Sequence, residues 1–270
     1  MNKKLIIIDL DGTTLDSFTT INKKNVEVIK KVRKLGHIVC IATGRPFRSS
    51  KQYYSILELD TLIANFNGTH IIHPYDENFE DVLLTIDAEP IRNLMKSEIM
   101  NQHVINAFCE YGNDVYLHHD DPDFHEFLLK TDDTVIINGH LSELSVSPNS
   151  MVLKFDEDYV EEVFAELNKF PTLSYRRWTG EGYTAFIEVY NKHYNKATAL
   201  SYIGEYYNIT IEDTIAIGDE HNDIEMVQAA GLGVCVNNAT QKLKDVADLI
   251  LDKKNTEGAV GHFLEEYFKL

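Results

Sequence analysis

The 270-residue sequence has little of several features that would place it in a special class of protein. It has no apolar run close to the roughly 20 residues that a membrane-spanning helix needs, and it has only 3 cysteines, 6 prolines and 1 tryptophan. Cys40, Cys109 and Cys235 are odd in number and far apart, so they predict neither a disulfide framework nor a CxxC metal site. Cys40 and Cys235 stand within apolar runs, and we expect both thiols to be buried and inert.

Positive charge is also scarce, because 25 Lys and Arg stand against 43 Asp and Glu, for a formal net charge of −18. Nucleic-acid-binding proteins normally carry a basic surface, so a nucleic-acid partner is not expected. A phosphorylated ligand is not excluded, since a bound cation can reverse the charge of a site locally. The apolar segment Leu5–Ile8 resembles a signal peptide only briefly, because Asp9 and Asp11 cut it short. We therefore expect a cytoplasmic protein with no membrane partner.

Short apolar segments alternate with helical patterns at both ends of the chain. Unbroken apolar runs, typical of strands buried on both faces, stand at Leu5–Asp9, Ile38–Ala42 and Leu62–Ala64. Helical periodicity follows the first two runs, at 21–35 and 46–57, and the same alternation returns from residue 195 to the end. After the third run, Asn67-Gly68 is typical of a hairpin turn into His70–His73. This order predicts a parallel sheet with helices on its faces.

The middle of the chain has a different pattern. Polar and apolar residues alternate in Val152–Phe155 and Ala185–Glu188, and one helical stretch stands at Asp158–Lys169. Strands and helices that are segregated in this way predict an antiparallel sheet with helices on one side. We therefore predict an α/β fold: a discontinuous, Rossmann-like parallel-sheet core of residues 1–82 and 190–270, with an inserted α+β domain at 83–189.

The segment Asp9-Leu10-Asp11-Gly12-Thr13 directly follows the first predicted strand, where open α/β sheets bind ligands. One carboxylate and the main-chain carbonyl of the other acid can converge there on a cation. Gly12 permits a sharp turn, and Thr13 can donate a hydrogen bond to an anion. The alternative is that the two acids only cap a turn.

A second acidic segment, Gly218–Asp223, lies between a predicted strand and a helix. Asp219 and Asp223 are four positions apart, so the loop and the first helical turn can direct both carboxylates to one place. Oxygen ligands of this kind suit Mg²⁺. The alternative is that Asp219, Asn222 and Asp223 cap the helix and interact with its dipole.

Two further segments offer groups for an anion. Thr43-Gly44-Arg45 stands between a strand and a helix, where free N–H groups form an anion site. Lys196 begins a later helix, and alone it would be read as a solvated surface residue. Together with the two acidic segments, these residues supply acids, a hydroxyl, N–H donors and a positive charge at the strand ends of one sheet.

The motifs DLDGT, ATGR, a single Lys before a helix, and GDExND, in this order, resemble those of the haloacid dehalogenase superfamily of phosphatases. The insertion resembles the large α+β cap, type C2B, of the Cof-type (type IIB) branch, and segments 63–68 and 218–239 are particularly similar to that branch. The resemblance covers both core segments, with a looser match over the insertion. It implies a core that carries the chemistry and a cap that selects the substrate.

The resemblance also implies residue roles. Asp9 matches the nucleophile that becomes an aspartyl-phosphate, and Asp11 matches the general acid that protonates the leaving oxygen and then, as base, activates water. Mg²⁺ would be held by Asp9, the Asp11 carbonyl and Asp219, with Asp223 steadying the other ligands. The residues that match the substrate and phosphate site are Leu10, Thr43, Gly44, Arg45, Lys196 and Asn222.

The chain departs from the family pattern at two positions, neither of which removes a catalytic atom. Glu220 stands where a small or amide residue is frequent, so it either adjusts metal binding or faces solvent. Ala197 follows Lys196 where glycine is common. In the insertion, two groups have alternative readings. A basic and aromatic cluster either clamps a substrate or is a solvated strand edge: Arg176, Arg177, Trp178 and Tyr183. A histidine group is either a second metal site or a hydrated loop: His118, His119 and His125.

These patterns predict a Mg²⁺-dependent phosphatase of small phosphorylated metabolites, such as sugar phosphates or nucleotide-type cofactors. A phosphomutase or phosphotransferase would use the same aspartyl-phosphate and exclude water. A non-catalytic phosphate-binding module would keep the fold without turnover, and the second acid, Asp11, speaks against it. A dinucleotide-binding oxidoreductase is rejected because the turn after the first strand lacks GxGxxG.

Overall fold

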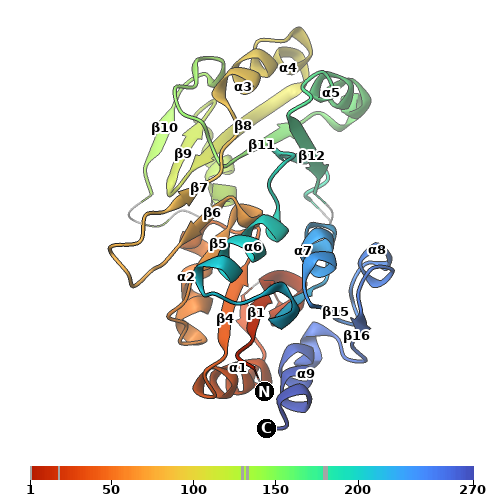
Figure 1. Ribbon diagram of the computed structural model, residues 1–270. Coiled ribbons are helices and arrows are strands. Elements are labelled where there is room, and N and C mark those ends of the chain that lie inside the picture. The colour runs from red at the N-terminus through yellow and green to blue at the C-terminus, as the bar shows by residue number, and fades with distance from the viewer. Residues whose placement is uncertain (1, 18, 129–130, 132–133, 179–181) are drawn as a thin grey trace. The chain divides into compact units, whose positions relative to one another are not determined.

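The computed structural model describes residues 2–17, 19–128, 131, 134–178 and 182–270 (Figure 1). The chain divides into two compact units. The core unit comprises Met1–Arg45, Ser50–Val82 and Asn195–Leu270, and the cap unit comprises Pro46–Ser49 and Leu83–Tyr194. Residues 46–49 and 190–194, which we expected in the core, therefore group with the cap. No helix among the described residues has both the length and the apolar character to cross a membrane.

An eight-stranded sheet with the order β16-β15-β14-β1-β4-β5-β6-β7 forms the centre of the core unit. Its strands are β1 (Leu5–Ile8), β4 (Ile38–Ala42), β5 (Ile63–Asn65), β6 (His70–Ile72), β7 (Val82–Leu83), β14 (Thr214–Gly218), β15 (Leu232–Cys235) and β16 (Leu249–Ile250). From β16 to β5 all neighbours are parallel, as predicted. β6 runs antiparallel to β5, which confirms the hairpin expected at Asn67-Gly68.

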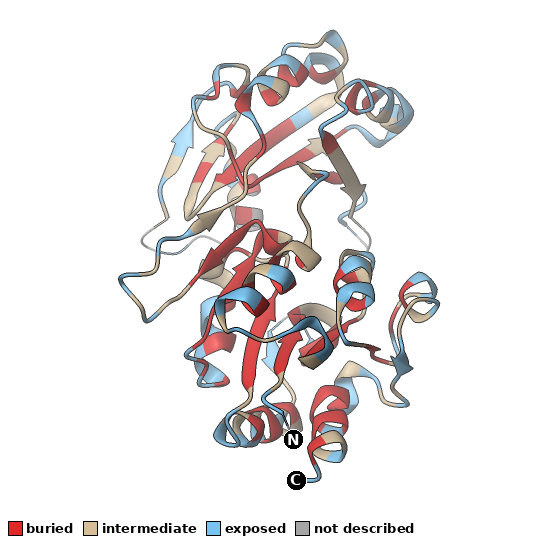
Figure 2. Cartoon of the chain, in the orientation of Figure 1, coloured by how far each residue is buried: buried red, intermediate tan, exposed pale blue. Residues whose placement is uncertain are grey.

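Helices surround this sheet, and a two-stranded ribbon follows β1. They are α1 (Lys23–Lys34), α2 (Phe47–Ile56), α6 (Lys196–Tyr206), α7 (Ile224–Ala229), α8 (Gln241–Lys244) and α9 (Ala259–Phe268), and the ribbon is β2 (Leu15–Ser17) with β3 (Thr20–Ile21). All four residues of β1 are fully buried (Figure 2), because helices cover both faces of the sheet. Leu5 and Ile7 pack in one cluster with Leu200 of α6 and Met226 of α7.

Strand pairing determines where the polar residues meet. β1 lies between β14 and β4, and Ile8 is in register with Ile217 on one side and Ile41 on the other. Because the three strands are parallel, their carboxyl ends meet at the same edge of the sheet. The residues that follow them are therefore neighbours in space although they are far apart in the sequence.

The cap unit contains a six-stranded sheet of order β10-β9-β8-β11-β13-β12. The strands are β8 (Val104–Tyr111), β9 (Asp114–Leu117), β10 (Ile136–Asn138), β11 (Ser150–Phe155), β12 (Leu173–Arg177) and β13 (Phe186–Asn191), and the helices are α3 (Ala88–Met95), α4 (Glu98–His103) and α5 (Val160–Leu167). Residues of all three helices pack in one cluster with Cys109, Met151 and Ile187 of the sheet, as the α+β prediction requires.

One strand pair of the cap differs from the expected antiparallel arrangement. β10 lies parallel to β9, with Ile136 in register with Val115. The physical reason is the path of the chain: between β9 and β10 it passes through a 3-10 helix at Pro122–Leu128 rather than a tight hairpin turn, so β10 starts again from the same end of the sheet.

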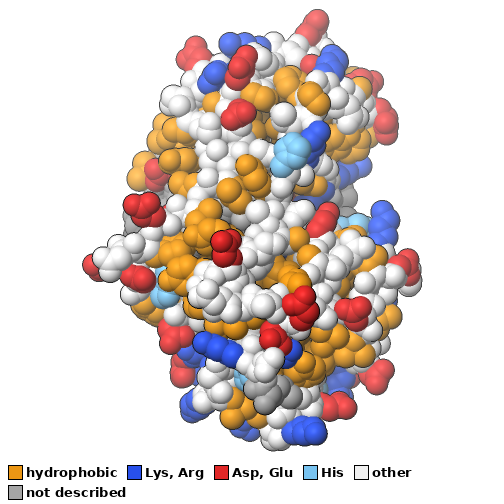
Figure 3. All heavy atoms as spheres, viewed as in Figure 1, with side chains coloured by type: hydrophobic (Ala, Val, Ile, Leu, Met, Phe, Trp, Pro, Cys, Tyr) orange, Lys and Arg blue, Asp and Glu red, His pale blue; other side chains and the backbone are white. Residues whose placement is uncertain are grey.

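The three cysteines are free and buried, which confirms the expectation for Cys40 and Cys235. On the face of the molecule drawn in Figure 3, acidic and basic side chains are interspersed rather than gathered by sign.

Candidate active site

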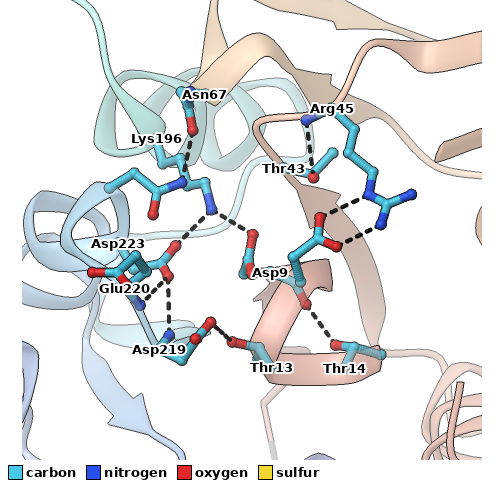
Figure 4. Close-up of polar contacts among 12 residues, drawn as sticks. Asp9, Thr13, Thr14, Thr43, Arg45, Asn67, Lys196, Asp219, Glu220 and Asp223 are labelled. Carbon is cyan, nitrogen blue, oxygen red and sulfur yellow. Dashed lines mark hydrogen bonds and ion pairs between the residues drawn. The ribbon is translucent and has the colours of Figure 1, made fainter. Parts of the chain in front are cut away.

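The site lies where β1, β4 and β14 end, and Figure 4 shows its polar contacts. Asp9 follows β1, Thr43 follows β4 and Asp219 follows β14. Lys196 enters from the first turn of α6. Asn195 caps this helix, accepting hydrogen bonds from the N–H groups of Ala197 and Thr198, and so fixes the start of the helix beside the sheet. The structure therefore brings together residues from four separate segments of the sequence.

Lys196 links two buried carboxylates. Its Nζ donates to Asp9 Oδ1 at 2.5 Å and to Asp223 Oδ1 at 2.6 Å, and its side chain is fully buried. Burial alone lowers the pKa of Lys196, but the attraction of Asp223 and Asp9 outweighs it, so the pKa lies above the ordinary value. Burial raises the pKa of Asp9 well above its ordinary value, and Lys196 opposes this rise. Lys196 is thus the counter-ion of Asp9 in the first acidic segment and of Asp223 in the second.

Asp223 orients the loop that carries Asp219. Its Oδ2 accepts hydrogen bonds from the main-chain N–H groups of Asp219 at 3.0 Å and Glu220 at 3.1 Å. This close approach depends on Gly218, because a Cβ atom there would lie 2.4 Å from Asp223 Cγ. The structure accordingly places Asp223 as a support for the loop, in contact with Lys196 on its other oxygen.

Asp219 faces the turn that follows β1. Thr13 Oγ1 donates to Asp219 Oδ1 at 2.7 Å. Gly12 has a φ of +73°, and a Cβ atom at this position would lie 2.1 Å from Asp219 Oδ2. Burial raises the pKa of Asp219 to about 7, and the nearby Asp223 carboxylate adds to the rise. Thr13 is thus a contact of Asp219 in this structure.

The three carboxylates form a donor set for a metal ion. Ligand oxygens of Asp9, Asp219 and Asp223 all lie within 4.8 Å of one another. Carboxylate oxygens are the ligands that Mg²⁺ prefers, and a cation here would offset the repulsion between acids that are crowded and largely buried. The residues present therefore fit a divalent cation of this kind.

Thr43 and Gly44 lie beside a residue that the sequence reasoning read only as a turn. Asn67 donates its main-chain N–H to the Thr43 carbonyl at 2.9 Å, and its Oδ1 accepts a hydrogen bond from Asn222 Nδ2 at 2.8 Å. A Cβ atom at Gly44 would lie 3.3 Å from Asn67 Oδ1. Asn67 therefore connects the segment after β4 to Asn222. An available signal was its place, directly after a strand, in a turn that needs positive φ.

The Arg45 guanidinium forms a two-point pair with Asp11. Nε donates to Asp11 Oδ2 at 2.7 Å and Nη2 donates to Asp11 Oδ1 at 2.5 Å. The guanidinium also lies over the Tyr53 ring, 5.2 Å from its centroid. Arg45, which we expected to bind the phosphate, is thus paired with Asp11, which we expected to act as the general acid.

Other candidate residues occupy less direct positions. The Leu10 side chain is fully buried, so only its main-chain atoms are available to a ligand. The Glu220 side chain is partly exposed and contacts its neighbour His221, whose main-chain N–H donates to Glu220 Oε1 at 2.8 Å. Ala197 uses its N–H to complete the Asn195 cap at 2.9 Å, so alanine is accommodated where the family often has glycine.

The two arginines of the basic and aromatic cluster point to opposite faces of β12, because successive side chains of a strand alternate in direction. Arg176 donates from Nε to Glu188 Oε2 at 2.8 Å, whereas Arg177 pairs with Glu157. The Trp178 ring stacks on that of Phe186, with centroids 5.3 Å apart.

The histidine group of the cap differs in membership from the one considered in the sequence. His118 and His119 lie close to His140, whereas His125 lies 3.2 Å from Asp120. His118 Nδ1 accepts the Leu141 main-chain N–H at 3.1 Å, which leaves the ring proton of the neutral side chain on Nε2. That tautomer opposes ligation of a metal through Nε2.

Comparisons with known proteins identify the family to which the sequence is similar. The sequence matches the family of haloacid dehalogenase-like hydrolases over residues 6–264. It is 36% identical to the 5-amino-6-(5-phospho-D-ribitylamino)uracil phosphatase YitU of Bacillus subtilis, over 98% of each chain. It is 32% identical to YcsE, a phosphatase of the same name from that organism, over 97% of this chain and 96% of the relative.

A solved structure shares the whole fold. A haloacid dehalogenase-like hydrolase from Bacteroides thetaiotaomicron superposes with a TM-score of 0.82 at 27% identity, covering 99% of this chain and 100% of its own. The resemblance predicted from the motifs is confirmed, as is the predicted combination of a parallel-sheet core and a cap.

Proposed function

This chain belongs to the haloacid dehalogenase-like hydrolases and is a phosphatase of phosphorylated small molecules, and we propose that it works with Mg²⁺ and through an aspartyl-phosphate on Asp9. The observation that carries the proposal is the buried Asp9 carboxylate, held by Lys196 beside Asp219 and Asp223. A carboxylate fixed in this way is oriented for attack without further ordering.

In the first step, a carboxylate oxygen of Asp9 attacks the phosphorus atom and the bond to the leaving oxygen breaks. The leaving oxygen takes its proton from Asp11, so the alcohol departs neutral. In the second step, Asp11 takes a proton from water, the water oxygen attacks phosphorus, and the bond to Asp9 breaks. Inorganic phosphate leaves and the Asp9 carboxylate is restored.

Charge stabilisation accounts for most of the rate in phosphoryl transfer. Lys196 already neutralises part of the charge on Asp9, and we assign it a contact with the phosphoryl oxygens as well. Thr43, the Gly44 N–H and Asn222 supply hydrogen-bond donors for the same oxygens. Asp9, the Asp11 carbonyl and Asp219 would hold Mg²⁺, and Asp223 orients the Asp219 loop. Bound there, the metal supplies positive charge that offsets the repulsion between the carboxylates and the phosphate.

The proposed substrate class follows from the two relatives. Both are named for a phosphate carried on a ribityl chain that is attached to a uracil ring. Their similarity extends over nearly the whole chain, cap included. We therefore propose a phosphomonoester of a sugar or sugar alcohol that carries a heterocyclic base, with the cap selecting the leaving group.

The test is phosphate release from p-nitrophenyl phosphate and from a panel of sugar phosphates, pyridoxal phosphate and the phosphoribitylaminouracil. We expect release with Mg²⁺, loss of release with EDTA, and no release by Asp9→Asn. Asp60→Asn, which changes an exposed acid paired with Arg33, is the matched control and should retain activity. Isomerised sugar phosphate without phosphate release, or full activity of Asp9→Asn, would contradict the proposal.

A further inference from the structure

We propose that Arg45 is a positioning residue that holds the Asp11 carboxylate in place for proton transfer to the leaving oxygen. The inference rests on the proposed function, because it assigns Arg45 a part in the acid step of that reaction. It replaces the sequence-based expectation that Arg45 contacts the phosphate. The geometry that points to it is the two-point pair in which Nε and Nη2 donate to separate oxygens of Asp11.

Arg45 is firmly anchored on its own side. Its main-chain N–H donates to Thr43 Oγ1 at 3.2 Å, and its carbonyl accepts from the Asn65 side chain at 2.9 Å and from the Phe66 N–H at 3.2 Å. Its side chain is only 14% exposed and its guanidinium lies over the Tyr53 ring. Contacts other than the one with Asp11 therefore hold both the backbone and the guanidinium of Arg45 in place.

Asp11 is the more exposed partner of the pair. Its side chain is 33% exposed, and its residue lies in a turn with non-helical backbone angles, directly before Gly12. A short, partly exposed carboxylate without a fixed partner would sample several rotamers. A guanidinium that binds both oxygens fixes the position of the carboxylate and the orientation of its plane. The anchored arginine thus determines where the more exposed acid lies.

This arrangement is compatible with proton transfer. Each carboxylate oxygen has two lone pairs, and the guanidinium uses one on each oxygen, so a site for the proton remains. A general acid must stand within hydrogen-bond reach of the leaving oxygen. A misplacement of about 1 Å in a catalytic group can lower the rate about 100-fold. Replacement of Arg45 should therefore slow the step in which Asp11 donates a proton to the leaving oxygen.

The experiment compares kcat/KM for two kinds of substrate, since this quantity reports the steps up to formation of the phosphoenzyme. 2,4-Dinitrophenyl phosphate releases a stable anion that needs no proton, whereas an alkyl phosphate needs the acid. We expect Arg45→Gln to lower kcat/KM for the alkyl phosphate about 100-fold, and to leave the dinitrophenyl ester within a few-fold of wild type. Asp11→Asn should show the same pattern, and Arg45→Lys should fall between.

Two further readouts separate this role from others. Inhibition by inorganic phosphate should be unchanged in Arg45→Gln. Arg33→Gln, which removes an arginine of similar exposure that pairs with Asp60 away from the site, should behave as wild type. Equal losses for both substrates together with weaker phosphate inhibition would overturn the inference, because Arg45 would then bind the phosphoryl group. Equal losses with unchanged inhibition, or no loss for either substrate, would also overturn it.

Thermal unfolding shows whether each variant is folded. If Arg45→Gln is not folded, Arg45→Lys must show a larger loss of kcat/KM for the alkyl phosphate than for the dinitrophenyl ester. An Asp9→Asn variant that still released phosphate would instead contradict the proposed function, and this inference with it.

Discussion

A Cβ atom on Gly12 would lie 2.1 Å from Asp219 Oδ2, so the turn after β1 meets the loop after β14 at a distance that only glycine allows. The two residues are far apart in the sequence, yet parallel pairing of β1 with β14 brings their loops together. Glycine is therefore required at position 12 for two reasons: the close approach of Asp219 and the positive φ.

We expect Gly12→Ala to displace Asp219 and to lower kcat/KM at least about 100-fold, a loss comparable with other displaced catalytic groups. Gly36→Ala is the matched control, since Gly36 also has a positive φ, +90°, but a Cβ atom there has nothing within 4 Å. Both variants should lose about 1–2 kcal/mol of unfolding free energy from backbone strain. Only Gly12→Ala should lose activity, and equal kcat/KM values in the two variants would contradict the role of Gly12.

Replacement of Lys196 should affect both stability and activity. Lys196→Met leaves Asp9 and Asp223 buried without their counter-ion, which we expect to lower the free energy of unfolding by about 3–5 kcal/mol and to abolish measurable turnover. Lys192→Met changes an exposed lysine four residues earlier and should have little effect on either. Denaturant unfolding and phosphate release measure the two effects. Wild-type activity in folded Lys196→Met would contradict the assignment.

The stability of the cap should depend on His118 at acid pH. Burial, together with His119 and His140, lowers the pKa of His118 to about 4, below the ordinary value of about 6.5. The unfolded chain therefore binds more protons between these values, and the stability that neutral His118 contributes is lost as the pH falls from about 6.5 to 4. The melting temperature of His118→Gln should consequently fall less than that of wild type as the pH is lowered over this range. His262→Gln, at an exposed position, should show the same fall as wild type. Parallel curves for all three proteins would contradict this expectation.

The three thiols should be unreactive in the native protein. Cys40, Cys109 and Cys235 are buried, and burial raises the pKa of each, that of Cys40 to about 12. We expect no labelling by a thiol reagent in buffer and labelling of all three after unfolding in guanidinium chloride. Rapid labelling of the native protein would show that one of them is accessible.

The buried strands were the most predictable part of the fold. The bounds of β4 (Ile38–Ala42) agree residue for residue with the apolar run in the sequence, because a strand buried on both faces has no polar positions to blur its ends. The parallel pairing of β10 with β9 could not be predicted in this way. It depends on the path of the chain between them and not on the pattern within either strand.

The site was predictable to the extent that it lies on strand ends. The structure brings Asp9, Lys196, Asp219 and Asp223 together, while their roles in catalysis stay predictions. The Asn67–Asn222 bond and the direction of the Arg45 guanidinium were not predictable. Both are set by side-chain directions at turns, where positive φ or a neighbouring ring decides the outcome and no periodicity applies.

The measurement that tests the covalent mechanism most directly is to trap the phosphoenzyme. Asp11→Asn is mixed with dinitrophenyl phosphate that carries a radioactive phosphoryl group, and the reaction is quenched with acid. Because this variant lacks the base for the water step, we expect label to accumulate on the protein, on the peptide that contains Asp9, and to be absent from Asp9→Asn. Phosphate release by the wild type with no protein-bound label in Asp11→Asn, or label on a peptide without Asp9, would contradict the aspartyl-phosphate mechanism.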